Sequence, residues 1–444
     1  MAAVAGPGVA AGRLHGDTAV TPGDGAERMP ARMAPVAVCA YTCSTAAGLG
    51  LAALADAVRQ QRSGLVVNTA TDDRDCRDGD GADDRNPALP AFVGRIDALR
   101  AQPLPAEWQD WDCRATRLAW LGLQADDFIA HARAAVLRHG ATRVGLVLGT
   151  SASTIAASEQ AYRALAADGG FPAHLRHRAR HSPHAVTAFT ALALGIAGPA
   201  VTVSTACSSS ARAFGQAERW LRLGLVDAVV VGGVDALCDS VLYGFHALGL
   251  VSPEPCRPFD ERRRGISVGE AAGFALLQRA GPGPETVHLL GYGEANDAHH
   301  MSSPHPLGLG AELSLDAALG RAGRLAQEVD YLNLHGTATP QNDAVEAALV
   351  ARRYAASVHA SATKGLTGHT MGAAGIVEAV LCLHALHSGW RSGSPQLAAA
   401  DPAFGPHFAG QLQLLPRQAP VALAASHSFG FGGNNAVLVF GAGR

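Results

Sequence analysis

The stretch that decides the fold is Ala200-Val-Thr-Val-Ser-Thr-Ala-Cys-Ser-Ser-Ser-Ala-Arg-Ala-Phe214. Its first residues are apolar and β-branched, which predicts a buried strand. Residues 208–223 predict a helix, and the serines and threonines before it are typical of a helix cap. Cys207 lies at this junction, where the positive end of the helix dipole would lower the pKa of the thiol. The stretch therefore predicts a reactive thiol between a strand and a helix, with a buried structural cysteine as the alternative.

Similar strand and helix units flank this stretch on both sides. The predicted strands are 36–41, 144–148, 228–234, 272–278, 287–292, 330–334, 421–425 and 436–440, and the predicted helices are 51–61, 114–139, most of 153–195 and 372–387. Continuous apolar strands that alternate with helices are typical of a sheet covered on both faces, so we expect an α/β fold. The order of elements begins again after the break at residues 281–285, which suggests a loose internal duplication. Charged segments at 72–86 and 256–270 are predicted to be surface loops.

Composition narrows the classes of function. The chain has 444 residues, of which 48% are hydrophobic and 16% charged, with a net charge of −3, so it can bury a large core and carries no basic footprint for nucleic acid. Its eight cysteines show neither CxxC nor zinc-site spacing, which predicts a reducing cytoplasm and no metal or organic cofactor. We expect no membrane span, because no run of 18 uncharged apolar residues is present. Residues 1–33 predict a disordered tail or an over-long gene start.

Three segments of the second half carry chemically active side chains. They are LNLHGTATP with His335, ATKGLTGHTMGAAG with Lys364 and His369, and SHSFGFGGNN with Phe429 and Phe431. The first places a histidine at the carboxyl end of a strand, where open α/β sheets bind ligands. The last is a glycine-rich turn, whose free N–H groups can hold a negative oxygen. The plainer alternatives are a satisfied histidine, a solvated lysine, a helix cap and core phenylalanines.

Taken together, these features favour one reaction class. A thiol at a helix start, two histidines on separate loops and an amide-rich turn suit acyl transfer through a thioester. A Cys/His hydrolase would use similar parts, but the second histidine and the lysine are surplus to it. Candidate acidic partners for Lys364 are Asp343 and Glu346, in the helix that follows His335.

The same segments resemble the β-ketoacyl-acyl carrier protein synthases, the condensing enzymes of fatty acid and polyketide synthesis. The matching stretches are TACSSS, HGTATP, KGLTGH, SFGFGG and, from Arg257, RPFDERRRGISVGEAAG, in order from about residue 35 to the end. The resemblance implies the thiolase fold, with two pseudo-symmetric βαβαβαββ halves stacked in α-β-α-β-α layers. Residues 34–282 would form the half with the nucleophile, and residues 283–444 the half with both histidines.

The resemblance also implies roles for single residues. Cys207 would take an acyl chain from a carrier-protein thioester, and His335 and His369 would serve decarboxylation of the malonyl carrier and stabilise the enolate. Lys364 matches a structural lysine whose acidic partner maps to Glu346.

The glycine-rich turn receives two roles from the same resemblance. The backbone amides of Cys207 and Phe431 match an oxyanion hole. Phe431, with Phe429 beside it, matches a gatekeeper between the two half-reactions. Asn434 departs from the family, because threonine is usual at this position.

The resemblance implies an acyl carrier protein as partner, which brings its own phosphopantetheine arm, so no cofactor of the enzyme itself is expected. Candidates for binding the carrier are Arg257, Arg262, Arg263 and Arg264, with a solvated loop as the alternative. SSSARAF, HGTATPQND and DAHHMSSPHP are most similar to the stand-alone synthases of aryl polyene pigment clusters. That similarity implies polyunsaturated chains and a homodimer, or a heterodimer with a Cys-less, chain-length-factor-like subunit.

Three other functions stay open at this point. One is a non-catalytic partner subunit of the same fold, which the presence of Cys207, His335 and His369 disfavours. Another is a thioester hydrolase or acyltransferase that uses only the first half-reaction. The third is a thiolase that acts on CoA esters, which the pair of histidine motifs disfavours.

Overall fold

The computed structural model describes residues 32–69, 89–165, 169–172, 176, 178–280 and 287–442. The predicted loop at 72–86, the break at 281–285 and nearly all of the predicted tail at 1–33 lie outside the described residues.

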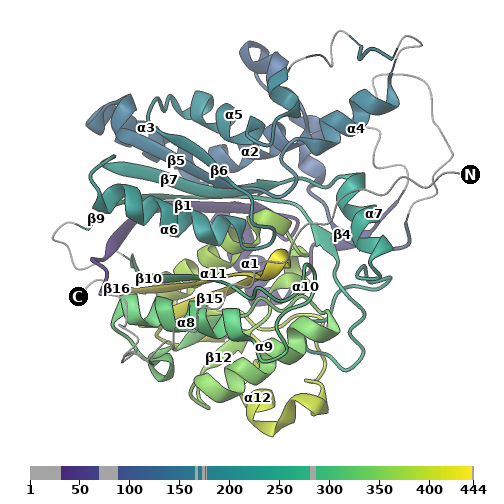
Figure 1. Ribbon diagram of the computed structural model, residues 1–444, viewed down its shortest axis with the longest axis vertical. Coiled ribbons are helices and arrows are strands. Elements are labelled where there is room, and N and C mark those ends of the chain that lie inside the picture. Colours follow the sequence, from purple (N-terminus) through teal and green to yellow (C-terminus); the bar gives the residue numbers. More distant parts are fainter. Residues whose placement is uncertain are drawn as a thin grey trace, which may run out of the picture.

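Two sets of five strands with the same internal order form the frame of the fold (Figure 1). The first set is β1 (Val36–Thr45), β5 (Val144–Gly149), β6 (Ala200–Val203), β7 (Ala228–Asp235) and β9 (Ala271–Arg279), and the second is β10 (Val287–Asn296), β11 (Tyr331–Asn333), β12 (His359–Ser361), β15 (Leu423–Gly430) and β16 (Asn434–Ala442). The spatial orders are β6-β5-β7-β9-β1 and β12-β11-β15-β16-β10. When the strands of each set are numbered along the sequence, both spatial orders run third, second, fourth, fifth, first. Neighbouring strands that are parallel in one set are also parallel in the other, and the same holds for the antiparallel pairs. This repeated order confirms the predicted duplication.

The two sets join where β1 pairs antiparallel with β10, Val36 opposite Leu289. Shorter strands complete the sheets: β2 (Gly48–Leu49) pairs with β1, β3 (Leu65–Val67), β4 (Phe92–Gly94) and β8 (Val268–Gly269) form a small sheet, and β13 (Trp390–Arg391) pairs with β14 (Arg417–Gln418).

Helices lie in three layers around the two strand sets (Figure 1). One outer layer holds α2 (Arg114–Gln124), α3 (Phe128–His139) and α5 (Ala185–Leu194), the other holds α8 (Leu309–Ala322), α9 (Pro340–Arg353) and α12 (Gly405–Gln411), and the middle layer holds α6 (Ser209–Arg222) and α11 (Ala374–Ser388). The other helices are α1 (Gly50–Gln60), which packs on β1, α4 (Ile155–Arg163), which packs on α7 (Asp239–Ala247), and α10 (Lys364–Thr367). The arrangement is the predicted α-β-α-β-α stack.

One predicted helix is broken in the structure. The stretch 114–139 forms α2 and α3, separated at Ala125–Asp127, where Asp126 has a φ of 53°. The Asp126 carboxylate accepts hydrogen bonds from the backbone N–H of Leu51, at 2.9 Å, and from the Thr42 hydroxyl, at 2.8 Å. The start of α1 has no capping side chain of its own, so this distant carboxylate caps it. A tertiary contact therefore overrides the helical periodicity of the sequence.

One described segment, Met371–Ser388, is long and apolar enough to cross a membrane by length and composition. Of its residues, 78% are buried inside the protein, where the segment lies in the middle layer beside α6, and it carries the buried Glu378. A core helix has the same composition.

The two middle helices approach each other through small residues. A Cβ atom added at Gly375, in the first turn of α11, would lie 2.5 Å from the backbone nitrogen of Ala211 in α6. A Cβ atom at Gly149, at the end of β5, would lie 2.3 Å from the nitrogen of Ser210. Both distances are shorter than any real contact, so glycine at these positions allows α6 to reach its place. The start of α6 carries Cys207, and its position depends on this close packing.

We expect Gly375→Ala to lower the free energy of unfolding by about 1–3 kcal/mol, because the added methyl group forces α6 and α11 apart in a packed core. Chemical denaturation would measure the change. Gly410→Ala in α12 is the matched control, since its Cβ would meet no atom within 4 Å, and it should leave the transition unchanged or slightly raised. Equal transitions for the two variants would contradict the close approach.

Candidate active site

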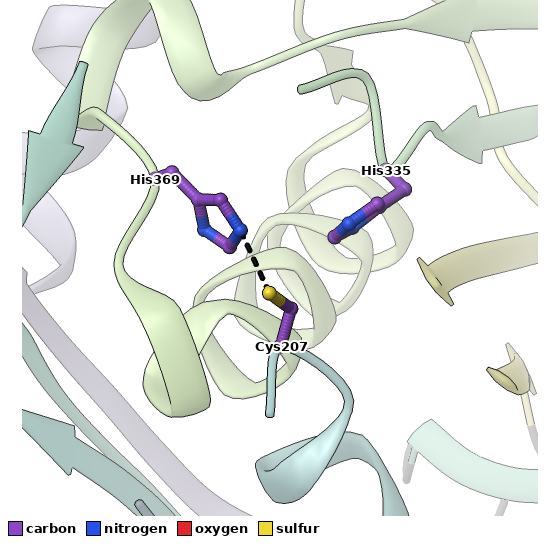
Figure 2. Close-up of side chains that lie close together, drawn as sticks. All are labelled: Cys207, His335 and His369. Atoms are coloured by element: carbon purple, nitrogen blue, oxygen red, sulfur yellow. Dashed lines mark hydrogen bonds between the residues drawn. The ribbon is translucent and has the colours of Figure 1, made fainter. Parts of the chain in front are cut away.

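Three segments far apart in the sequence bring Cys207, His335 and His369 to one point (Figure 2). Cys207 lies in the turn between β6 and α6, His335 follows β11, and His369 lies between α10 and α11. Their sulfur and ring nitrogen atoms all lie within 4.8 Å of one another, and all three residues are buried. In Figure 2 the two rings approach the sulfur from different sides. The structure thus brings together the three residues proposed from sequence.

Each of these turns contains a non-glycine residue in the left-handed region. Ala206, directly before Cys207, has a φ of 53°, Ala338 has a φ of 66°, and Met371 has a φ of 53°. Ala338 lies three residues after His335, and Met371 two residues after His369. Such a conformation costs about 1 kcal/mol or more for a residue with a Cβ atom. The surrounding structure therefore holds these turns in conformations that the local chain disfavours.

Hydrogen-bond donors fix the tautomer of both histidines. The Lys364 ammonium lies 3.3 Å from His335 Nδ1, and the Met371 backbone N–H donates to His369 Nδ1 at 3.2 Å. Because neither an ammonium nor a backbone N–H can accept a hydrogen bond, both Nδ1 atoms must be acceptors. The protons of the neutral rings are therefore assigned to the Nε2 atoms. His369 Nε2 lies 3.0 Å from the Cys207 sulfur.

These three residues also have the atom types that bind Zn²⁺, a thiol and two imidazoles. A metal would need a lone pair on each ring nitrogen that faces it. Because Lys364 and Met371 direct the protons of both rings to Nε2, His369 presents an N–H group, not a lone pair, to the sulfur. The hydrogen bonding favours proton donation by these rings over metal binding.

Both imidazoles are neutral at physiological pH. Burial lowers the pKa of His335 well below its ordinary value, and the positive charge of Lys364 lowers it further. Burial and then Lys364 lower the pKa of His369 in the same way. The site therefore contains two neutral, buried N–H donors.

The thiol of Cys207 differs from its prediction. Burial raises its pKa to about 11, although the Lys364 charge and a hydrogen bond from the Phe431 backbone N–H both lower it. The start of α6 at Ser209 acts in the same lowering direction. Because burial outweighs these effects, the resting thiol is protonated at neutral pH, and the predicted lowering of its pKa is wrong.

Lys364 has an acidic partner other than the predicted one. Its ammonium donates to Glu378 and to the backbone oxygen of His335. Glu346, the predicted partner, instead accepts the backbone N–H groups of His335 and Gly336, each at 2.8 Å. The prediction was wrong because Glu346 projects from α9 toward the backbone of the turn, whereas α11 places Glu378 against the lysine. Burial raises the pKa of Glu378 to about 7, and Lys364 opposes this.

Glu378 was not among the residues predicted from the sequence, although the sequence contains a signal for it. It is the only acidic residue within α11, whose other residues are mostly apolar, and it is 2% exposed. A single carboxylate in an apolar helix indicates a buried partner, since an unpaired buried charge is costly. His427, which contacts Glu346 at 3.0 Å, was missed as well.

The three residues line a cavity with an empty volume of about 630 Å³, its open mouth included. Phe431 and Phe429 line it too, together with Phe245 of α7 and the hydroxyl-bearing Thr337 and Thr339. The Phe431 and Phe245 rings are 5.7 Å apart in an edge-to-face contact, so this aromatic pair stands at one side of the cavity. The predicted glycine-rich turn is therefore part of the cavity wall.

The predicted arginine cluster is divided by the structure. The Arg263 side chain is only 11% exposed and forms an ion pair with Asp401 at 2.6 Å. Because this ion pair already engages its charge, its predicted role in carrier binding is wrong. Arg262 and Arg264 are exposed, and Arg257 is half-buried and paired with a neighbouring acid.

Comparison with known families agrees with this geometry. Residues 33–282 match the family described as Beta-ketoacyl synthase, N-terminal domain, and residues 287–396 match Beta-ketoacyl synthase, C-terminal domain. The chain belongs to the beta-ketoacyl synthase family. It is a transferase that catalyses the condensation step of fatty acid or polyketide elongation on acyl carrier protein substrates.

Similar proteins come from several bacteria. Nodulation protein E of Rhizobium meliloti (strain 1021) is 34% identical over 309 residues, which cover 68% of this chain and 76% of that protein. The 3-oxoacyl-[acyl-carrier-protein] synthase 2 of Staphylococcus aureus is 32% identical over 275 residues, covering 58% and 67%.

Solved structures of ketosynthases with chain length factors are similar over nearly the whole chain. The ketosynthase ApeO in complex with its chain length factor ApeC, from Xenorhabdus doucetiae, gives a TM-score of 0.81 at 32% identity and covers 92% of this chain and 98% of that one. The ishigamide ketosynthase/chain length factor gives 0.77 at 26% identity, covering 93% and 100%.

The raised pKa of Cys207 gives a test of the site. We expect the rate of its alkylation by iodoacetamide to keep rising up to about pH 10 without a plateau, because only the thiolate reacts and the pKa is about 11. Peptide mapping by mass spectrometry would follow the modified residue. A small thiol such as N-acetylcysteine, measured in parallel, should level off at lower pH. A plateau for Cys207 below that of the small thiol would contradict the assignment.

Proposed function

We propose that this chain performs decarboxylative Claisen condensation with Cys207 as the nucleophile and with His335 and His369 as hydrogen-bond donors to the reacting oxygen. The observation that carries the proposal is the meeting of a thiol with two neutral imidazoles in one buried cavity. A hydrolase needs one such histidine, whereas stabilisation of an enolate uses both.

In the first half-reaction, the Cys207 sulfur attacks the thioester carbonyl of an acyl carrier protein. A new C–S bond forms, the carrier's C–S bond breaks, and the thiol proton of Cys207 ends on the departing carrier thiolate. The backbone N–H groups of Cys207 and Phe431 are the candidates for holding the oxyanion, and the Phe431 N–H already bonds to the sulfur.

In the second half-reaction, a malonyl carrier replaces the first carrier. The bond between its α-carbon and the carboxylate breaks, CO₂ leaves, and the electron pair forms an enolate. The Nε2–H groups of His335 and His369 donate to the enolate oxygen. The enolate carbon then attacks the Cys207 thioester, a C–C bond forms, and the sulfur leaves as thiolate, which takes up one proton from solvent to restore the resting thiol. Lys364 supports this step by keeping the proton of His335 on Nε2.

Two variants separate this mechanism from its alternatives. Cys207→Ala should abolish acyl loading. His335→Ala should lower the rate of decarboxylation of malonyl carrier protein at least about 100-fold, because the histidine acts on the enolate. The same variant should keep the rate of acyl loading within a few-fold of the wild type. Mass spectrometry would report loading, and exchange of labelled CO₂ would report decarboxylation. Cys39→Ala, at an exposed cysteine, is the matched control. A wild-type chain that loads acyl groups but does not decarboxylate malonyl carrier would be a hydrolase or acyltransferase.

For the substrate and partner, we propose polyunsaturated chains of the aryl polyene kind and pairing with a second ketosynthase-like chain. The similarity to ApeO, which is in complex with a chain length factor, supports both. β6 supports the pairing, since it lies at the end of the strand order and its Val201 is 39% exposed. The helix α5, which contacts β6, carries Leu192, which is 51% exposed. An apolar edge strand favours pairing with another chain.

The carrier protein and the compartment complete the proposal. The exposed Arg262 and Arg264 remain our candidates for contacting an acidic carrier protein. The seven described cysteines are free thiols, which fits our proposal of a cytoplasmic location.

Purification from the native host would test the substrate and the partner together. We expect a dimer, with itself or with a chain-length-factor-like protein, and an acyl group on Cys207 whose mass shows several double bonds. Val201→Lys should weaken the dimer, because a charge on an edge strand opposes pairing. Size-exclusion chromatography would measure the oligomeric state, and mass spectrometry would measure the acyl group on Cys207. A saturated acyl group would rule out the aryl polyene assignment.

A further inference from the structure

A series of buried hydrogen bonds connects the backbone of His335 to side chains that do not line the cavity. The Tyr354 hydroxyl lies 2.8 Å from His427 Nε2, and His427 Nδ1 lies 3.0 Å from Glu346 Oε1. The same carboxylate accepts the backbone N–H groups of His335 and Gly336. The three side chains that take part, Tyr354, His427 and Glu346, are at most 4% exposed. Glu346 therefore connects His427 to the backbone that carries His335.

The directions of these hydrogen bonds are set by what each group can donate. Glu346 Oε1 accepts the His335 N–H, and Oε2 accepts the Gly336 N–H. The carboxylate acts as an acceptor throughout, so His427 donates from Nδ1. In the neutral ring Nε2 then accepts the proton of the Tyr354 hydroxyl. In this assignment, each hydrogen bond between Tyr354, His427 and Glu346 pairs one donor with one acceptor.

His427 also contacts the cavity wall. Its ring packs on that of Phe429 with centroids 5.0 Å apart, and Phe429 lies 6.0 Å from the His335 ring. His427 thus touches the surroundings of His335 at two places, through the Glu346 carboxylate and through Phe429, but does not itself line the cavity.

We propose that His427 is a positioning residue, which holds Glu346 so that the backbone at His335 presents the imidazole to the enolate. The inference rests on the proposed function and assigns it a residue outside the cavity. The His335 ring is held at Nδ1 by Lys364, while its backbone is held by Glu346. Without His427, the carboxylate would lose one of its partners and could turn away from the two backbone N–H groups.

The effect should fall on one half-reaction. Small displacements of a reacting group can cost up to about 100-fold in rate. His335 serves the malonyl step, whereas Cys207 and the turn at Phe431 serve the loading step and have no hydrogen bond to this series. Loss of His427 should therefore lower decarboxylation about 10-fold or more and change acyl loading little.

Two substitutions separate the link to Glu346 from the link to Tyr354. In His427→Asn, the side-chain amide can place an N–H near the position of Nδ1 and keep the bond to Glu346. In His427→Gln, the longer amide reaches toward the position of Nε2 and keeps the bond to Tyr354 instead. Tyr354→Phe removes only the outer bond and should be close to the wild type in both half-reactions.

The experiment measures acyl loading of Cys207 by mass spectrometry and kcat and KM for decarboxylation of malonyl carrier protein, on the full chain. We expect His427→Asn to keep kcat within about threefold and His427→Gln to lose about tenfold or more, both with normal loading and with little change in KM. The thermal transition of each variant shows that it is folded, and if His427→Ala does not fold, the comparison of Asn with Gln still decides.

Each other result overturns the inference. Equal kcat for the Asn and Gln variants would show that the bond to Glu346 is not what matters. A parallel loss of loading and decarboxylation would show a merely structural role. A wild-type chain that neither loads nor decarboxylates would instead refute the proposed function, so the two failures are distinguishable.

Discussion

The buried ammonium of Lys364 is the interaction on which the site depends. It donates to Glu378, to the backbone of His335 and to Nδ1 of the same histidine, so all three of its protons are engaged. Its charge lowers the pKa of Cys207 and of both cavity histidines. One cation therefore sets the tautomer of one ring, adds to burial in keeping both rings neutral, and opposes the rise in the pKa of the Cys207 thiol that burial causes. Such a charge is stable inside a protein only because Glu378 balances it.

The packing of the molecule explains why these groups meet. The first half supplies the thiol and the second half supplies both histidines and the lysine, so no single half contains the site. Contact between the halves depends on small residues where α6 and α11 approach, as at Gly375. Strained turns at Ala206 and Met371 then direct the side chains inward. The packing between α6 and α11 therefore also determines the geometry of the site.

Sequence alone predicted what is local and missed what depends on distant partners. The strand, turn and helix around Cys207, and the arrival of His335 at a strand end, follow from hydrophobic pattern and turn residues. The break between α2 and α3 could not be predicted, because it depends on the Asp126 carboxylate reaching the start of α1. The choice of Glu378 over the predicted acid depends on which face of α11 meets the lysine. The raised pKa of the Cys207 thiol depends on how deeply the residue is buried, which cannot be determined from a sequence motif.

The two strand sets place the turns that carry Cys207 and His369 at equivalent positions. α6 follows the third strand of the first set, and α11 follows the third strand of the second, so the turns that carry Cys207 and His369 occupy corresponding places in the two halves. A pseudo-twofold axis passes between them. Two identical half-chains would place the same residue at both turns. The pairing of a thiol with an imidazole at this place therefore requires two halves of different sequence within one chain.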